Sequence, residues 1–256
     1  MDTGLAGKVA LVVGGGSGIG RATALEFARE GATVVVAGRR ERELSMVVER
    51  INAGGGRGLA VTADVTRPDQ VAHVVDAVMS EFGALDAVAN CAAVVDRVEG
   101  MLTGTVADFD RVIDVNLRGA WLVLRTAGQA MVGLGRSGAM VTVSSINALR
   151  PGTVDYSASK AGVEGLTRAA AKVLGPHGIR VNALRSGFID TEMLRYAWDV
   201  PADVPFPIGP SERANVPLGR VGQPSETAQA IVWLCSSASS YVTGTCLDVD
   251  GGALVD

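Results

Sequence analysis

Lysine is scarce in this 256-residue chain, which has only Lys8, Lys160 and Lys172 and takes almost all of its positive charge from arginine. An arginine serves equally well as an ordinary solvated cation. What lysine adds is a compact ammonium that donates to several oxygens at once and can give up its proton. A lysine within a recognisable pattern therefore indicates a chemical use.

Residues that bind metals or act as catalytic bases are also few. The three cysteines are odd in number and show no paired spacing, which predicts free buried thiols. The cysteines and the two histidines together form no metal-binding pattern. These residues are Cys91, Cys235, Cys246, His73 and His177. Neither histidine has a catalytic context, and neither Ser17 nor Ser145 lies in a G-x-S-x-G turn. The sequence therefore argues against a metal site and against a serine hydrolase.

Long apolar runs, basic clusters and Pro/Ser-rich linkers are absent as well. The net charge is −4, which favours neither nucleic acid nor an acidic surface as a partner. No apolar stretch is long enough to span a membrane, and the glycine-rich segment near residue 14 comes too early to follow a secretory signal. We expect one domain over 1–256 in the cytoplasm, with no nucleic acid and no membrane partner.

Short apolar runs alternate with helical patterns along the chain, which is typical of an α/β fold. The pattern predicts a single Rossmann-like, doubly wound parallel sheet of about seven strands with helices on both faces. The expected strands are 8–13, 33–37, 57–62, 86–89, 138–143, 178–184 and 244–249.

A glycine-rich turn joins the first predicted strand to the first predicted helix. Glycines in such a turn let a diphosphate approach the backbone, and the amides at the helix start favour its negative charge. The candidate cofactor-binding residues are Gly14, Ser17, Gly18, Ile19 and Gly20. A flexible turn without a ligand is the plainer alternative.

Two arginines, Arg39 and Arg40, follow the second predicted strand at the place where an acidic residue would bind the 2′-hydroxyl of NAD. A guanidinium offers a planar fork of donors that suits a phosphate, so these residues favour NADP. Glu41 and Glu43 keep NAD possible, and two arginines that merely begin a solvated helix are the alternative.

Tyr156 and Lys160 are four residues apart in a segment that reads as helical, so their side chains lie on one face about one turn apart. A phenol is a poor base near neutral pH unless a nearby positive charge stabilises the phenolate. The pair is therefore a candidate acid–base group, although the same spacing also occurs on ordinary helix surfaces.

Together these motifs resemble the classical short-chain dehydrogenases/reductases, and the resemblance covers essentially the whole chain. It is carried by the order of Gly14, Gly18, Gly20, Asp64, Asn90, Asn116, Ser145, Tyr156, Lys160 and the run 248–252. The resemblance implies hydride transfer between a nicotinamide and a carbinol or carbonyl carbon, with Tyr156 as acid–base group. It implies that Lys160 holds the nicotinamide ribose and favours the phenolate.

Further roles follow from the same resemblance. Ser145 would hydrogen-bond the substrate oxygen, with Ser144 as the alternative, and Asn116 would anchor a water chain from Lys160 or simply bond locally. The remaining implied cofactor contacts are Asp64 and Val65 at the adenine, Asn90 at the adenosine ribose, Ile189 at the carboxamide and Thr191 at the phosphates.

The chain departs from the family pattern at three places. Val13 replaces a frequent threonine, Cys91 replaces the second asparagine of an Asn-Asn-Ala-Gly turn, and Ser186 replaces a customary proline. The segment from Ser145 to Tyr156 is also about two residues shorter than expected. None of these changes removes a reacting group.

The segment 192–217 is predicted to be a lid over the substrate. Its aromatic residues, Tyr196, Trp198 and Phe206, favour an apolar or ring-containing ketone, although they could instead pack the lid onto the body or a neighbouring subunit. The Ala/Gly-rich helix 154–174 resembles the family's subunit contact and implies a homotetramer, with packing on its own sheet as the alternative.

We therefore expect an NADP-dependent reductase or dehydrogenase that interconverts a ketone and a secondary alcohol. A 3-oxoacyl-type reductase and an NAD-dependent alcohol dehydrogenase are alternatives within the same chemistry. A dehydratase or isomerase on the same fold, or a dinucleotide-binding protein without turnover, are alternatives outside it.

Overall fold

Seven strands form one parallel sheet in the order β3-β2-β1-β4-β5-β6-β7 in the computed structural model, which describes residues 2–95, 101–150, 152–204, 206 and 215–255. The strands are β1 (Val9–Val13), β2 (Thr33–Gly38), β3 (Arg57–Thr62), β4 (Ala87–Asn90), β5 (Gly138–Ser145), β6 (Ile179–Ser186) and β7 (Cys246–Val249). Every predicted strand lies within two residues of these bounds. The predicted doubly wound α/β sheet is confirmed.

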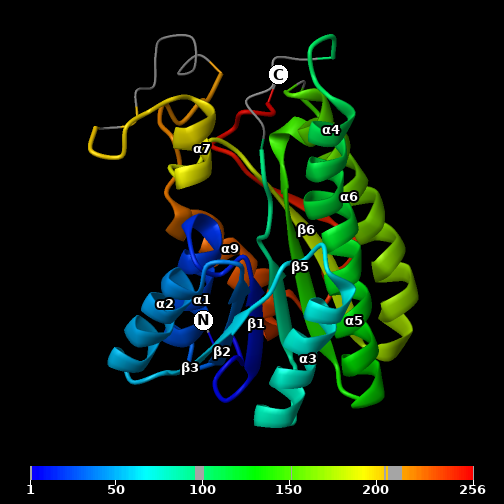
Figure 1. Ribbon diagram of the computed structural model, residues 1–256. Coiled ribbons are helices and arrows are strands. Elements are labelled where there is room, and N and C mark those ends of the chain that lie inside the picture. The colour runs from blue at the N-terminus through cyan, green and yellow to red at the C-terminus, as the bar shows by residue number, and fades with distance from the viewer. Residues whose placement is uncertain (1, 96–100, 151, 205, 207–214, 256) are drawn as a thin grey trace.

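Helices cover both faces of the sheet (Figure 1). One face carries α1 (Gly18–Arg29), α2 (Glu41–Ala53) and α9 (Pro224–Cys235), and the other carries α3 (Pro68–Phe82), α5 (Gly119–Gly133) and α6 (Val154–Leu174). Successive residues of β1 alternate between them, since Leu11 packs on the α3 and α5 side while Val12 packs on the α1 and α2 side. Burial on both faces explains why the strand sequences are almost continuously apolar.

Three shorter segments complete the described helices. They are α4 (Val106–Ile113), a π-helical turn (Asp114–Arg118) that leads directly into α5, and α7 (Glu192–Ala197). Single 3₁₀ turns lie at Ile146–Ala148, Gly175–His177 and Ser237–Ser239. None of the helices described is long and apolar enough to cross a membrane.

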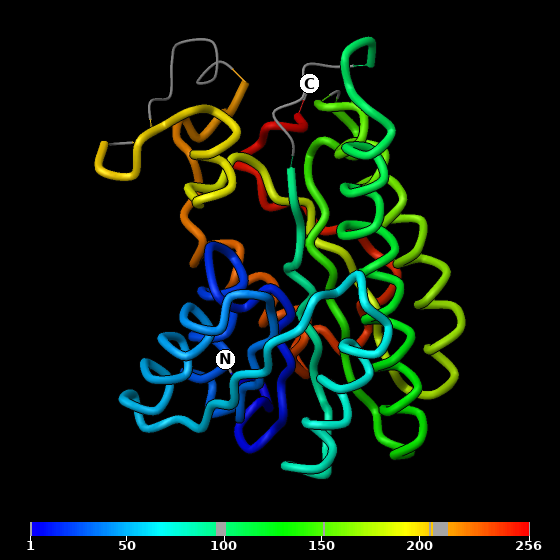
Figure 2. The backbone as a smooth tube through the Cα atoms, viewed as in Figure 1, coloured from blue at the N-terminus to red at the C-terminus, as the bar shows by residue number. Residues whose placement is uncertain are grey.

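The strand order reverses direction between β1 and β4. The chain builds outward from β1 to β3 and then returns to place β4 on the other side of β1. In open parallel sheets, ligands bind beyond the carboxyl ends of the strands at such a switch point. Figure 2 shows the yellow α7 segment above the blue turn that joins β1 to α1, so two distant parts of the sequence meet at this edge.

Candidate active site

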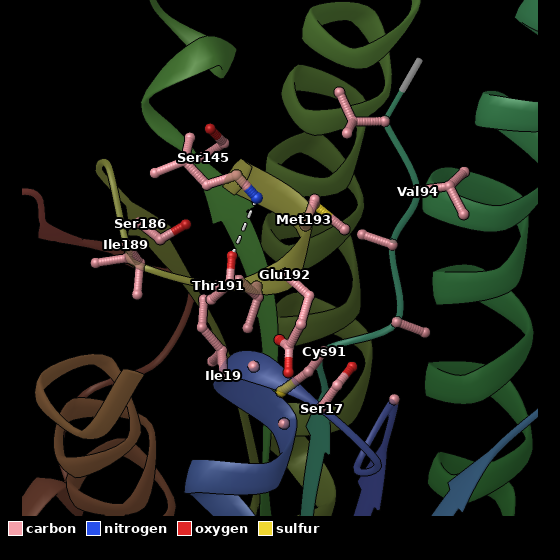
Figure 3. Close-up of a pocket in the computed structure, with 18 of the residues that line it drawn as sticks. Ser17, Ile19, Cys91, Val94, Ser145, Ser186, Ile189, Thr191, Glu192 and Met193 are labelled. Atoms are coloured by element: carbon pink, nitrogen blue, oxygen red, sulfur yellow. Dashed lines mark hydrogen bonds between the residues drawn. The ribbon is translucent and has the colours of Figure 1, made fainter. Parts of the chain in front are cut away.

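A cavity of about 530 Å³ opens at the switch point (Figure 3). Loops that follow β1, β2, β3, β4, β5 and β6 all contribute to its walls, together with α6 and α7. Most of the predicted site residues line it, namely Gly14, Ser17, Gly18, Ile19, Gly20, Arg39, Arg40, Asp64, Val65, Ser145, Tyr156, Lys160, Ile189 and Thr191. Asn90 and Asn116 do not line it.

The glycine turn is built for close backbone contact. The amides of Gly14 and Gly15 donate to the Ala37 carbonyl oxygen at 2.7 and 3.2 Å, which ties the turn to β2. Gly14 has φ of +77°, and a Cβ atom there would lie 2.7 Å from the Ala92 amide nitrogen. A Cβ at Gly20 would collide with the Gly14 carbonyl oxygen. Only glycine allows this tight turn, which leaves the amides at the start of α1 facing a site that fits a diphosphate.

The two arginines after β2 have different surroundings. Arg40 donates from Nη2 to the Ser17 hydroxyl at 2.7 Å and lies 3.4 Å from the Glu43 carboxylate, so it braces the glycine turn. Arg39 is exposed at the cavity wall and has no polar partner in the part of the chain that the structure describes. Its guanidinium donors therefore remain free for an anionic group of a ligand.

Asp64 and Val65 form the wall beyond β3. The Asp64 carboxylate accepts hydrogen bonds from the amide and hydroxyl of Thr66 at 2.9 and 2.8 Å. The amide of Asp64 donates to the Gln70 side chain at 2.8 Å. These contacts hold a short turn rigid at the cavity wall, and the adenine contact stays a prediction.

Tyr156, Lys160 and Ser145 converge on the cavity from α6 and β5. The ammonium of Lys160 lies 5.4 Å from the centre of the Tyr156 ring and donates to the Val143 carbonyl oxygen at 2.8 Å. The Ser145 hydroxyl lies near the Tyr156 phenol and lowers its pKa, and the Ser145 oxygen accepts from the Asn147 amide at 3.2 Å. Two hydroxyls and one cation are thus held together at one place.

Burial sets the protonation of this group. It raises the pKa of Tyr156 to about 12, and the hydrogen bond from Ser145 offsets only part of this effect. Burial also lowers the pKa of Lys160 to about 8. At neutral pH the phenol therefore carries its proton, which differs from the expectation that Lys160 would favour the phenolate.

The structure distinguishes the two serines of β5. Ser144 is fully buried and donates to the Glu164 carboxylate at 3.1 Å, away from the cavity, whereas Ser145 lines it. Adjacent residues of a strand point to opposite faces, so only one of the two can reach a ligand. The position of Ser145 agrees with its predicted role.

Asn116 lies in the π-helical turn and is buried beside the cavity. Its side chain exchanges hydrogen bonds with the backbone of Val94 at 2.8 and 2.9 Å and donates to the Ser159 hydroxyl at 3.1 Å. Asn116 thus connects the loop after β4 to α6, and its part in a water chain stays a prediction. Asn90 accepts from the Ala92 amide at 3.3 Å and braces the same loop.

The segment after β6 leads into α7. Ile189 is buried against the cavity, and the Thr191 hydroxyl accepts from the Leu194 amide at 3.3 Å and so caps α7. Asp190 and Arg195 form a two-pronged ion pair with contacts of 2.7 and 2.8 Å. These contacts hold α7 over the cavity.

The aromatic residues of the predicted lid separate into different roles. Trp198 lines the cavity and packs edge-on against Phe188, with ring centres 5.4 Å apart, while Phe206 packs behind it at 5.5 Å. Tyr196 is 52% exposed and does not line the cavity, so the expectation that it shapes the substrate site is not supported. Residues 205 and 207–214 of the predicted lid lie outside the described residues.

Several residues line the cavity although no sequence pattern identifies them as site residues. Asn147 lines the cavity two residues after Ser145, and Glu192 lines it while lying 3.4 Å from Arg21 of α1. Val94 belongs to the loop after β4 and lies across the cavity from Ser186 and Ile189 in Figure 3. Only the folded arrangement brings these residues to the site.

No group of three or more metal-binding side chains occurs within the described ranges. The fold and cavity instead define an α/β protein of the dinucleotide-binding class, with a tyrosine, a lysine and a serine at the switch point.

Known proteins resemble this chain in sequence and in fold. A family model described as enoyl-(acyl carrier protein) reductase matches residues 13–253. The 3-oxoacyl-[acyl-carrier-protein] reductase of Thermotoga maritima is 38% identical over 98% of this chain and 99% of its own. The cis-4-hydroxycyclohexanecarboxylate dehydrogenase of Sinomonas cyclohexanicum is 39% identical over 98% of both chains. A crystal structure of a short-chain type dehydrogenase/reductase from Mycobacterium marinum is 37% identical with a TM-score of 0.91, covering 98% of this chain and 97% of that one.

The chain therefore belongs to the classical short-chain dehydrogenase/reductase family of oxidoreductases.

Proposed function

We propose that this protein is an NADP(H)-dependent oxidoreductase that interconverts a ketone and a secondary alcohol, with Tyr156 as the acid–base group. The observation that carries the proposal is the convergence of Ser145, Tyr156 and Lys160 on the same cavity as the glycine turn. Two hydroxyls at one point suit a single substrate oxygen.

The residues divide the work as follows. A bound nicotinamide coenzyme would supply or accept the hydride. The Tyr156 hydroxyl gives its proton to the substrate oxygen, and the Ser145 hydroxyl donates to the same oxygen and fixes its orientation. Lys160 would hold the ribose hydroxyls of the coenzyme next to Tyr156, and Asn116 would anchor a water chain that returns a proton from solvent.

The protonation of Tyr156 favours the reductive direction. A phenol with a pKa of about 12 carries its proton near neutral pH, so it can act as the acid that a carbonyl oxygen needs. Oxidation of an alcohol requires the deprotonated phenolate, which can accept the proton of the alcohol. The protonated phenol therefore suits the reductive step, while the ratio of reduced to oxidised coenzyme sets the net direction.

The coenzyme preference rests on Arg39. This guanidinium faces the cavity without a polar partner among the described residues, and its planar donors suit the 2′-phosphate of NADP. Glu41 and Glu43 begin α2 nearby, and the Arg40 contact to Glu43 leaves one of them occupied. NAD use remains the alternative.

An apolar or ring-containing ketone fits the substrate end of the cavity. Phe188, Met193, Leu194 and Trp198 line it, and the cyclic substrate in the name of the Sinomonas relative agrees with such a surface. The Thermotoga relative favours a second candidate, a 3-oxoacyl thioester.

Absorbance at 340 nm tests the function directly. The purified protein is incubated with NADPH or NADH and a panel of cyclic ketones, open-chain ketones and 3-oxoacyl thioesters. We expect NADPH oxidation to be fastest with a cyclic ketone. NADPH binding without oxidation of any carbonyl would support a non-catalytic protein, and substrate conversion without a net change of coenzyme would support a dehydratase or isomerase.

The predicted homotetramer belongs to the same proposal. Val154 and Val173 at the two ends of α6 are exposed apolar side chains at 42% and 67%, as expected for a helix that takes part in a subunit contact. Sedimentation at working concentration tests it, and a stable monomer would contradict it. A cytoplasmic location stays a prediction.

A further inference from the structure

A buried ion pair lies directly behind the reacting group. Arg185 of β6 donates from Nε and Nη2 to the two carboxylate oxygens of Glu164 at 2.6 and 2.8 Å. The Glu164 side chain is 5% exposed and that of Arg185 is 15% exposed. Neither residue lines the cavity. Two charges are therefore held out of water at a place where they cannot touch coenzyme or substrate.

The pair is part of a row of polar side chains across three strands. Ser144 of β5 pairs with Arg185 of β6, which in turn pairs with Asp248 of β7. Paired residues of parallel strands project to the same face of the sheet, and here that is the face crossed by α6. Ser144 donates to Glu164 at 3.1 Å, and Arg185 donates to Asp248 at 3.0 Å. The carboxylate on α6 is thus bound to β5 and β6 at once.

Glu164 lies on the same face of α6 as the reacting residues Tyr156 and Lys160. It follows Lys160 by four residues and Tyr156 by eight, so the three side chains lie along one face of α6. Its partner Ser144 is the residue next to Ser145 on β5. The contacts of Glu164 therefore join the helix that carries the phenol and the ammonium to the strand that carries the second hydroxyl.

Small residues surround Lys160 on α6. They are Ala158, Ala161, Gly162 and Gly165, and the fully buried Val163 is the larger apolar side chain in this stretch. A guanidinium that grips both oxygens of a carboxylate has a strict geometry. A buried ion pair contributes little net stability, because apolar residues can often replace it without loss. The role that remains for Glu164 and Arg185 is to fix the orientation of α6 on the sheet.

We infer that Glu164 and Arg185 are positioning residues whose ion pair sets the placement of Tyr156 and Lys160 relative to Ser145. The inference rests on the proposed function for its kinetic consequence. A displacement of about 1 Å at reacting groups can reduce a rate by about 100-fold. Loss of the pair is expected to lower kcat and to leave the Michaelis constant for NADPH nearly unchanged, because the glycine turn and Arg39 lie elsewhere.

The scarcity of lysine provides a test that needs no turnover. Replacing Lys8 and Lys172 by arginine leaves Lys160 as the only lysine, so the NMR signal of a ¹³C-labelled lysine ε-carbon reports its titration alone. Lys8→Arg keeps the cation beside Asp86, and Lys172 is exposed. In this background we expect Glu164→Gln to move the titration midpoint of Lys160 from about 8 by at least roughly half a pH unit, because a displaced helix changes the water and the charges around the amine. We expect kcat to fall by about 10- to 100-fold.

Two milder variants and one control complete the experiment. Glu164→Asp keeps the charge but shortens the side chain and loses the two-pronged contact, and Ser144→Ala removes one donor, so each is expected to give a smaller change in the titration of Lys160. They also serve if Glu164→Gln does not fold. Glu81→Gln breaks the exposed contact between Arg57 and Glu81. It is expected to change neither the titration midpoint of Lys160 nor kcat.

The outcomes separate this inference from the proposed function. An unchanged Lys160 titration in folded Glu164→Gln and Glu164→Asp would overturn the positioning role, whatever the activity. A shifted titration in a protein that reduces no carbonyl would support the positioning role and reject the proposed function. Equal loss of kcat in the Glu81→Gln control would also overturn it.

Discussion

Lys160 holds its ammonium 5.4 Å from the centre of the Tyr156 ring while donating a hydrogen bond to the Val143 carbonyl oxygen at 2.8 Å. The lysine is 2% exposed, and burial moves the two groups in opposite directions. It lowers the pKa of the Lys160 amine to about 8 and raises the pKa of the Tyr156 phenol to about 12. A protonated phenol beside a readily titrated amine is an arrangement that can deliver a proton and be recharged.

Tyr156→Phe is expected to reduce turnover by about 10²- to 10⁴-fold while NADPH binding stays within about twofold, because the hydroxyl transfers the proton and the ring only packs. The measurement combines NADPH oxidation at 340 nm with coenzyme fluorescence. Tyr196→Phe is the matched control, since Tyr196 is 52% exposed and away from the cavity. Retained activity in Tyr156→Phe would refute the assignment of the acid.

Lys160→Met is expected to make the fold more stable near pH 7, while turnover is lost and NADPH binds more weakly. The folded-state pKa of Lys160, about 8, lies below the ordinary value of 10.5. The unfolded chain therefore binds more protons between these values, and the burial penalty is complete below pH 8 and disappears as the pH approaches 10.5. The penalty is about 3 kcal/mol at pH 7, less the lost hydrogen bond to Val143.

Urea unfolding of the wild type and Lys160→Met at pH 7 and pH 9.5 measures this difference. Titration of Tyr156 and the cysteines affects both proteins alike and largely cancels. The advantage of the methionine variant should shrink at the higher pH. An equal advantage at both values would show that the amine is not destabilised by burial.

Arg39→Ala is expected to raise the Michaelis constant for NADPH by about tenfold or more and that for NADH by less than about twofold, because a charge-assisted contact to the 2′-phosphate is lost. Arg42→Ala is the matched control, since Arg42 is exposed on α2 and does not line the cavity. Arg40→Ala should weaken both coenzymes equally, because it braces the glycine turn through Ser17. Equal effects of Arg39→Ala on both coenzymes would remove the argument for NADP.

Trp198→Ala is expected to lower kcat/KM for cyclic ketones by about 10-fold or more, since it removes a large cavity-lining ring and its contact with Phe188. Tyr196→Ala should stay within about twofold of the wild type, because Tyr196 is not among the residues that line the cavity. Steady-state kinetics with one cyclic and one small open-chain ketone measure both variants. Similar losses in the two variants would mean that the lid acts through its fold and not through its contact with substrate.

Local sequence was sufficient to predict the glycine turn and the tyrosine–lysine pair. Gly14 and Gly20 reflect a backbone constraint that acts over a few residues, and Tyr156 and Lys160 depend only on helical spacing. The strands were equally predictable, because burial on both faces leaves a nearly continuous apolar run.

Other site features depended on contacts between distant segments. Asn116 lies in a π-helical turn. No local sequence pattern indicates the change in backbone hydrogen bonding that produces this turn. Tyr196 and Trp198 are two residues apart in the same short segment, and only the packing of Trp198 on Phe188 decides which ring enters the cavity.

The sequence by itself determined the order of strands and helices, the glycine turn and the identity of the candidate reacting groups, because these follow from short-range backbone geometry and from the period of apolar residues. Tertiary structure alone decided that Ser145 rather than Ser144 faces the cavity, that Glu164 meets Arg185, and that burial keeps Tyr156 protonated. The alternation of side chains along a strand predicts that Ser144 and Ser145 point to opposite faces of the sheet. Only the packing of the helices determines which of the two faces opens into the cavity. A pKa likewise depends on how much water the rest of the fold excludes.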